Sequence, residues 1–440
     1  MAQGKSKTNA KRKANGPARA KTNGKGNGST PAVKLDPQKL DPKFHFMTFM
    51  PYAHLPADHK KYDSLWVDYS NANYDPAKGK ALYDRYINEF ELADQLGFDG
   101  IVVNEHHSSI YSMMPAPNLI ASALIQRTQN AKICVWGTPP NLEYPNRLAE
   151  EYAMLDVMSG GRLEVAFPLG TGMEYWSHPI SPAKARGMHE ESIEIILKCW
   201  TQDGPVTHDG RHYHYRYLNP WPRPMQKPHP KMYLVGSGSP ETMEMAGRLG
   251  VGYTVAFFPH KQQIELNENV RRIGRKYGHE IGPDKFPMGA MVFVAETDKQ
   301  AEEEYRPHIQ YFFENCLRTT PNFLAPPGYM SIEKMRRRLE LSTRVHGGFD
   351  WDFMTSQFRI CAGSPETVAT KIAGWMTDVQ ASVVNCQAHL GDLPHWKTVK
   401  NLTMLAQEVF PRVREKLGVA PKHGARAQHA TFDPVAARMF

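Results

Sequence analysis

The chain has 440 residues, of which 41% are hydrophobic and 22% are charged, and its formal net charge at pH 7 is +8. These fractions are typical of a globular protein, and no apolar run is long enough to predict a membrane span. The positive charge is concentrated in residues 1–34, which carry nine Lys or Arg and no acid, so 44 basic and 45 acidic residues remain elsewhere. The near-neutral charge of the chain outside residues 1–34 therefore excludes a strongly basic, nucleic-acid-binding folded domain.

The two ends of the chain are expected to lie outside the folded part. Residues 1–43 predict a disordered basic tail, because they are rich in Gly, Asn, Lys and Ala, and residues 421–440 predict a C-terminal tail. A solubilising leader is the preferred interpretation of the basic tail, and an electrostatic arm for nucleic acid or an acidic partner is the alternative. The tail lacks the apolar region of a secretory signal. The cysteines have no C-x-x-C spacing and indicate reduced thiols in a cytoplasmic protein: Cys134, Cys199, Cys316, Cys361 and Cys386.

Between the tails, short apolar segments alternate with amphipathic ones. The amphipathic segments predict helices at 81–97, 146–160, 185–200 and 364–379. Such alternation favours parallel strands joined by crossovers, and eight units predict a (β/α)₈ barrel over residues 44–420 with its active site at the carboxyl ends of the strands. An open doubly wound sheet is the alternative, but no G-x-G-x-x-G follows the first strand. The predicted strands are 44–49, 100–103, 132–137, 162–167, 231–236, 252–257, 288–295 and 382–388.

Three stretches interrupt this repeat. Residues 51–80 follow the first strand, where a lid over the site would lie. Residues 202–230 alternate around "HDG", which predicts a hairpin followed by a proline-rich connector rather than a metal site of its histidines. Residues 315–355 form a long insertion before the last βα unit. Long loops on such a scaffold often select the substrate.

The motif "NEHH" at 104–107 directly follows the second predicted strand, at the rim of the catalytic face. Its two adjacent histidines lack the spacing of a zinc site and a third ligand, so no metal is predicted. A histidine near its ordinary pKa is suited to proton transfer at neutral pH. Glu105, His106 and His107 are therefore the candidate catalytic residues. His106 is preferred, since Glu105 and His107 could equally hydrogen-bond neighbouring loops.

The pentapeptide "GSPET" occurs twice, at 238–242 and at 363–367. In both copies Ser and Pro predict the start of a helix. The first copy also follows the strand "MYLV" through Gly236, Ser237 and Gly238, and such a glycine turn before a helix N-terminus can hold a phosphate with its N–H groups, with Ser239 and Glu241 opening the helix. The second copy has only "CAG" before it, and capping alone explains it.

A cation beside this turn would strengthen phosphate binding. Arg186, in "SPAKARGMHEES" at the start of a predicted helix, follows the fourth strand and its loop "PLGTGMEYW". A surface arginine without a ligand is the alternative interpretation.

The assembled pieces resemble the bacterial luciferase-like flavin-dependent monooxygenases over residues 44 to 417. The stretches that carry the resemblance are "ADQLGFDGIVVNEHH", "PNRLAEEYAMLDVMSGGRLEVAF", "LGTGMEY", "HPKMYLVGSGSPETMEMAGRLG", "AGSPETVATKIAGWM" and "AQEVFPRV". Each is weak alone, but their order and spacing are specific. The family implies a barrel that binds FMN, or the deazaflavin F420 in a related branch, at the carboxyl ends of the strands.

The resemblance also implies roles for single residues. His106 falls where the family has a histidine near the reactive edge of the flavin, and Arg186 where it has a phosphate-contacting arginine. The first "GSPET" matches the family's phosphate loop and the second a structural helix start. Trp136, Gly137 and Thr138 fall beside the flavin ring.

The loop after the fourth strand departs from the family. Leu169 stands where bacterial luciferase has an arginine for the phosphate, so the backbone of residues 170–172, beginning at Gly170, is expected to take part instead. This difference leaves the choice of FMN over F420 less secure. Tyr144 replaces the histidine that the family usually has before "P-x-R".

The reaction implied by the family is oxygenation of a small organic substrate. Reduced FMN, supplied by a separate NAD(P)H-dependent flavin reductase, would react with O₂ to a C4a-peroxyflavin that transfers one oxygen atom. The absence of a Rossmann fingerprint suits this two-component arrangement. The family also implies a homo-oligomer. The alternatives are F420-dependent hydride transfer on the same barrel, or a non-catalytic flavin- or nucleic-acid-associated protein whose basic tail is the working part.

Overall fold

The computed structural model describes residues 40–256, 259–333, 335–336 and 349–420. The predicted C-terminal tail and residues 1–39 of the predicted basic tail lie outside the described residues, as does part of the insertion predicted at 315–355. The predicted boundaries of the two tails therefore stay predictions.

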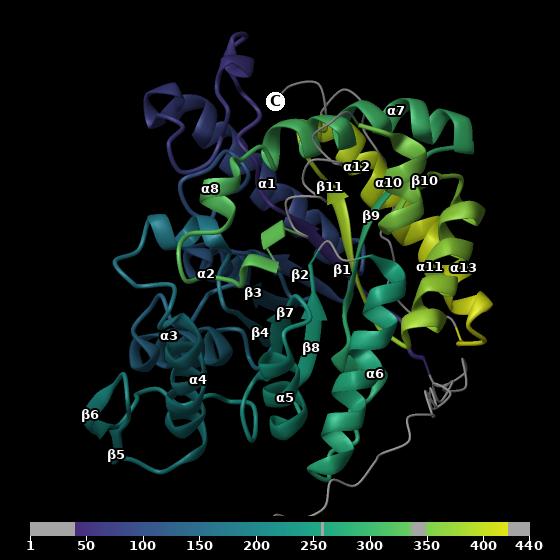
Figure 1. The fold of residues 1–440 in the computed structure, drawn as a ribbon. Coiled ribbons are helices and arrows are strands. Elements are labelled where there is room, and N and C mark those ends of the chain that lie inside the picture. The colour runs from purple at the N-terminus through teal and green to yellow at the C-terminus, as the bar shows by residue number, and fades with distance from the viewer. Residues whose placement is uncertain (1–39, 257–258, 334, 337–348, 421–440) are drawn as a thin grey trace, which may run out of the picture. The chain divides into compact units, whose positions relative to one another are not determined.

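The described chain is built around one parallel sheet in which the strand order is β10-β9-β11-β1-β2-β3-β4-β7-β8 (Figure 1). All eight predicted strands are present within one or two residues of their expected ends, and the fold class is confirmed. One further strand, β10, pairs with β9 and was not predicted. The strands are β1 (Lys43–Thr48), β2 (Gly100–Val103), β3 (Lys132–Trp136), β4 (Leu163–Pro168), β7 (Lys231–Gly236), β8 (Gly252–Val255), β9 (Met288–Val294), β10 (Ile360–Gly363) and β11 (Val383–His389).

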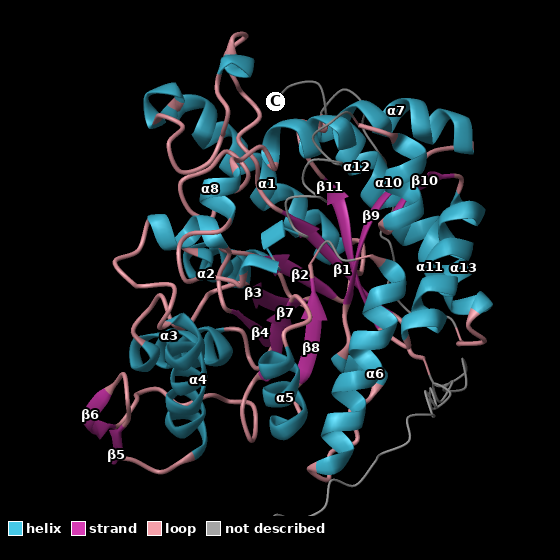
Figure 2. Cartoon of the chain, viewed as in Figure 1, coloured by secondary structure: helices cyan, strands magenta, loops and turns pink. Residues whose placement is uncertain are grey.

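Helices flank this sheet, and most of them connect one strand to the next (Figure 2). Several begin with proline at the first helical position, which lacks only an N–H that would be unpaired there anyway. The predicted hairpin at 202–230 is confirmed as the antiparallel pair β5 (Val206–Asp209) and β6 (His214–Leu218). The helices are α1 (Pro76–Gln95), α2 (Pro117–Arg127), α3 (Pro145–Met158), α4 (Ala185–Thr201), α5 (Pro240–Leu249), α6 (His260–Lys276), α7 (Asp298–Tyr311), α8 (Pro321–Leu324), α10 (Trp351–Gln357), α11 (Pro365–Val379), α12 (His395–Met404) and α13 (Phe410–Lys416).

The sheet differs from the expected closed barrel at one seam. Among the described residues, no ladder hydrogen bonds pair β8 with β9, so the hydrogen-bonded sheet runs from β10 to β8 without closing. β8 has only four residues, and Pro287 immediately before β9 has no N–H to donate. A side-chain bond spans the seam instead, from Thr254 Oγ1 to the carbonyl of Pro287 at 3.0 Å.

Buried side chains separate into a large core and a smaller cluster from adjacent strands. The large core packs the helices on the outer face of the strands. The smaller cluster takes residues from β2, β3, β4 and β7, and its two members on β3 are two positions apart, so they lie on one face of that strand. Its members are Val102, Cys134, Trp136, Ala166 and Tyr233.

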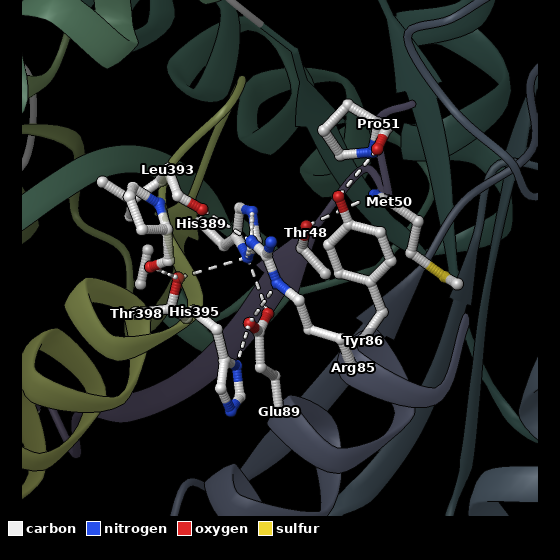
Figure 3. A network of polar contacts seen from close by, with 12 residues as sticks. Thr48, Met50, Pro51, Arg85, Tyr86, Glu89, His389, Leu393, His395 and Thr398 are labelled. Atoms are coloured by element: carbon white, nitrogen blue, oxygen red, sulfur yellow. Dashed lines mark hydrogen bonds and ion pairs between the residues drawn. The ribbon is translucent and has the colours of Figure 1, made fainter. Parts of the chain in front are cut away.

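A buried charged network joins the first helix to the last barrel strand (Figure 3). The Glu89 carboxylate on α1 lies 2.6 Å from Nδ1 of His389, 2.8 Å from Nδ1 of His395 and 3.1 Å from Nε of Arg85. Arg85 also reaches Nε2 of His389 at 2.8 Å. Burial alone would raise the pKa of Glu89, but the contacts with His389 and His395 outweigh it and hold that pKa well below its usual range. The network therefore fastens α1 to β11 and α12.

No helix of the described residues is long and apolar enough to cross a membrane. The five cysteines are free, as their spacing led us to expect, and all five are buried. Burial raises the pKa of Cys199 and of Cys361 to about 11, so these thiols are poor nucleophiles at neutral pH.

Candidate active site

The candidate segments follow four neighbouring strands at their carboxyl ends. The "NEHH" motif follows β2, Gly137 and Thr138 follow β3, Leu169 and Gly170 follow β4, and the first "GSPET" follows β7. β2, β3, β4 and β7 are successive neighbours in the parallel sheet. The carboxyl ends of parallel strands meet at one edge, so the four segments share the face where barrel enzymes place their sites.

His106 is held by a buried carboxylate. Its Nδ1 lies 2.7 Å from Oε1 of Glu174, which belongs to the short 3₁₀ helix η4 (Gly172–Trp176) after β4. The imidazole also meets Trp66 edge-on at a centroid distance of 5.6 Å and Tyr111 at 4.7 Å. These contacts fix both the ring plane and the nitrogen that faces the carboxylate.

His107 forms a second pair with a carboxylate from its own motif. Its Nε2 lies 3.0 Å from Oε1 of Glu105, and its ring meets His178 edge-on at 4.7 Å. Burial raises the pKa of Glu105. Burial alone would lower the pKa of His107, but the hydrogen bond and the charge of Glu105 outweigh it, and the pKa is raised. The His107–Glu105 hydrogen bond therefore lies within the loop that follows β2.

The ends of β2 and β3 carry buried polar atoms without partners. Both side-chain polar atoms of Asn104 and the Nε1 of Trp136 form no hydrogen bond with any described residue. Gly137 has a φ of +144°, and a Cβ there would lie 3.1 Å from the backbone nitrogen of Glu105. Glycine thus lets the end of β3 approach the end of β2. Buried orphaned polar atoms at such an edge are the groups that a polar heterocycle would satisfy.

The hydroxyl groups of two tyrosines hydrogen-bond to the loop after β4. The Leu169 carbonyl accepts a hydrogen bond from the Tyr175 hydroxyl, and the Gly170 carbonyl accepts one from Tyr329 at 2.7 Å. Gly170 has a φ of +89°, which favours glycine. Tyr329 belongs to the 315–355 insertion, so this insertion reaches across to the loop that carries Glu174.

The two "GSPET" copies differ at their helix starts. In the second, the Asp298 carboxylate accepts from the backbone N–H of Ser364 at 2.7 Å and from the Thr367 hydroxyl at 3.0 Å. The N-terminus of α11 therefore already carries a negative charge from the protein itself. In the first, the Ser239 side chain makes no capping bond to the α5 backbone and instead contacts the Thr242 hydroxyl at 2.7 Å.

Arg186 and the first "GSPET" lie together, as the interpretation of both as one site requires. Nη1 of Arg186, in the first turn of α4, is 3.6 Å from Oε2 of Glu241, in the first turn of α5. The guanidinium remains partly exposed. Gly238 has a φ of +84°, and its N–H donates to the Tyr253 hydroxyl at 3.2 Å. Ser237 and Gly236 complete the turn between β7 and this helix start.

The stretch at 51–80 and the 315–355 insertion are bonded to each other beside the "NEHH" motif. Trp66 Nε1 donates to the Cys316 carbonyl at 2.6 Å, and Leu65 N donates to the Arg318 carbonyl at 2.9 Å. The N–H of Val67 donates to the Ser108 carbonyl at 2.7 Å, directly after "NEHH". These two segments therefore cover the side of the site on which His106 lies.

Two residues of this arrangement were not predicted. Glu174 carries a usable signal, because Thr171-x-x-Glu174 matches a capping box. One hydrogen bond of this capping box is present in the structure: Oε2 of Glu174 accepts it from the backbone N–H of Thr171. Trp66 lies in a stretch without periodicity, and no local signal distinguishes it from the other aromatic residues there.

These features define an α/β-barrel enzyme with histidine–carboxylate pairs and a helix start beside an arginine at one edge. The comparisons with known proteins agree with this class. A model of the luciferase-like monooxygenase family matches residues 63–380, which is more than half of the chain. The chain therefore belongs to the luciferase-like monooxygenase family, and the prediction of a flavin-dependent monooxygenase, an oxidoreductase, is confirmed.

Individual relatives are distant. The oxygenase component of flavin-dependent trigonelline monooxygenase from Acinetobacter baylyi is 28% identical over 281 residues, 60% of this chain and 75% of that protein. Across eight curated relatives, the matched part spans between 51% and 92% of the relative's length, and for several it is less than two thirds.

Solved structures share the fold at lower identity. The oxygenating constituent of 3,6-diketocamphane monooxygenase from Pseudomonas putida, in complex with FMN, has a TM-score of 0.62 at 21% identity and covers 85% of this chain and 99% of its own. An F420-dependent secondary alcohol dehydrogenase has a TM-score of 0.59 at 17% identity, with the same two coverages.

Proposed function

We propose that this protein is the oxygenase of a two-component system, which uses reduced FMN and O₂ to oxygenate a small organic substrate. The observation that carries the proposal is the contact between Arg186 and Glu241 at 3.6 Å, because it joins the predicted cation to the predicted phosphate turn on the face that holds His106. The relative from Acinetobacter baylyi is named as an oxygenase component, which supports a separate NAD(P)H-dependent reductase as partner.

The residues present fit FMN. Among the described residues, no carboxylate is bonded to the backbone at the N-terminus of α5 in the manner of Asp298 at α11, so this helix start suits a phosphate. The unpartnered polar atoms of Asn104 and Trp136 suit the heteroatoms of a flavin ring. FMN, when bound and reduced, supplies the electrons that activate O₂.

The residues of the chain would then have separate roles in binding the phosphate, moving a proton and excluding water. Arg186 and the turn that begins at Gly236 bind the phosphate, with the backbone after Leu169 beside them. His106 holds or moves a proton at Nε2. Trp66 and Tyr111, both buried, exclude water from the histidine side of the site.

Replacing Arg186 by alanine is expected to weaken FMN binding by about 1–3 kcal/mol, which is roughly 5- to 150-fold, because a charged hydrogen bond to the phosphate is lost. Fluorescence titration with FMN measures the change. Riboflavin lacks the phosphate, so its affinity should stay the same in this variant.

Lys184→Ala is the matched control, since it removes an exposed positive charge only two residues away. It should leave FMN affinity within about 2-fold of the unmodified protein. Equal FMN affinity in Arg186→Ala and in the unmodified protein would reject the phosphate role.

The alternative cofactor is F420, which would serve hydride transfer without oxygen. Parallel titrations with FMN and F420 separate the two, and we expect FMN to bind at least about 10-fold more tightly, a difference of about 1.4 kcal/mol. Tighter binding of F420, or substrate turnover with F420 in the absence of O₂, would replace the proposed function by the alternative.

A further inference from the structure

Glu174 is a buried carboxylate that contacts His106, and the proposed function gives it no role so far. It is 2% exposed, and its two carboxylate oxygens have different partners. Oε1 lies 2.7 Å from Nδ1 of His106, and Oε2 accepts from the backbone N–H of Thr171. The carboxylate is thus anchored to its own loop while it faces the histidine.

This arrangement determines the tautomer of the imidazole. An ionised carboxylate can only accept hydrogen bonds, so the proton between the two groups belongs to Nδ1 of His106. In a neutral imidazole Nε2 is then the acceptor. Among the described residues nothing hydrogen-bonds to Nε2, while Trp66 and Tyr111 meet the ring only edge-on. Nε2 is therefore the nitrogen that remains for a ligand.

The 315–355 insertion packs closely against the loop that carries Glu174. A Cβ at Gly172 would lie 2.0 Å from the carbonyl oxygen of Leu324 in α8, so only glycine permits this approach. The Tyr329 hydroxyl holds the Gly170 carbonyl of the same loop. These contacts hold the backbone of the loop that carries Glu174.

We infer that Glu174 is a positioning residue, which holds His106 as the Nδ1–H tautomer and leaves Nε2 free at the reacting edge. The inference about the tautomer rests on the hydrogen bond between His106 and an ionised Glu174. Its consequence for catalysis rests on the proposed function, since it assumes that His106 acts beside reduced FMN.

The test is ¹⁵N NMR of imidazole-labelled protein without flavin, where the His106 signals are identified by their loss in His106→Asn. In the unmodified protein we expect neutral His106 to be protonated at Nδ1. In Glu174→Gln we expect loss of this preference, because the carboxylate that accepts the Nδ1 proton is gone. Glu174→Asp, which keeps the carboxylate, should restore most of the preference.

Glu105→Gln is the matched control for the NMR measurement, because it changes the buried carboxylate paired with the neighbouring His107. It should move the His107 signals and leave the tautomer of His106 as it is. An Nε2–H tautomer in the unmodified protein, or His106 signals that are the same in Glu174→Gln, would overturn the inference. The first result needs only the assignment from His106→Asn, so a failure of Glu174→Gln to fold does not prevent the test.

A second readout separates this inference from the proposed function. With reduced FMN and O₂, Glu174→Gln should change the rate of hydrogen peroxide release in the same direction as His106→Ala, while FMN affinity is retained. If the NMR results are as expected but His106→Ala leaves the oxygen reaction unaltered, the positioning contact stands and the proposed role of His106 fails. If the rate of peroxide release stays fixed while the tautomer of His106 changes, the catalytic consequence is wrong.

Discussion

Replacement of His106 by alanine is expected to accelerate hydrogen peroxide release from enzyme-bound reduced FMN after mixing with O₂, because the site loses a side chain that excludes water. The variant loses the imidazole that Glu174 holds at 2.7 Å, and the space beside Trp66 and Tyr111 opens to water. FMN affinity should be retained, because the proposed phosphate contacts lie on α4 and α5. Stopped-flow absorbance with a peroxide assay measures the rate.

The control for this experiment is His214→Ala. His214 is an exposed histidine of the β5–β6 hairpin that pairs with Asp209, so it tests the loss of a histidine outside the candidate site. Its peroxide release should match that of the unmodified protein. A His106→Ala protein with the same rate as this control would remove His106 from the proposed mechanism.

Replacement of Glu89 by glutamine is expected to lower the free energy of unfolding by about 3–5 kcal/mol, because breaking a buried pair leaves its partners uncompensated. His389 is fully buried, and Arg85 is largely buried beside it. Urea unfolding followed by circular dichroism measures the change. Asp84→Asn on the same helix breaks only an exposed pair with Lys80 and should change stability by less than about 1 kcal/mol.

The pH dependence of this effect has a definite sign. The pKa of Glu89 is depressed in the folded protein, so its stabilising contribution is complete above the unfolded value of about 4.5 and is lost as the pH falls below it. The difference between the unmodified protein and Glu89→Gln should therefore be constant near neutral pH and shrink in acid. Equal stability of the two proteins at pH 7 would contradict the role given to this network.

Much of the fold was predictable because it depends on local patterns. Apolar runs identified the eight barrel strands, and Ser-Pro starts identified α5 and α11. β10 was missed because "ICAG" is short and was interpreted only as the approach to the second "GSPET". The open seam between β8 and β9 was missed because strand pairing depends on neighbours distant in sequence, which a single segment does not encode.

The candidate site was predictable where a motif sits at a strand end, and not where partners come from other elements. His106 and the first "GSPET" follow strands directly, so the barrel fixes their face. The pairing of His106 with Glu174 joins residues 68 positions apart. Likewise, the repeated pentapeptide alone does not reveal that Asp298 accepts a hydrogen bond at the helix start of the second copy. These contacts arise from tertiary packing.

The proposed function requires one flavin bound by the segments at the carboxyl ends of β2, β3 and β7. A crystal structure of the protein with FMN tests this most directly. We expect the phosphate to contact Arg186 and the N–H groups at the start of α5, with the ring beside Trp136 and His106. A phosphate bound elsewhere, with His106 and Trp136 remote from the ring, would contradict it.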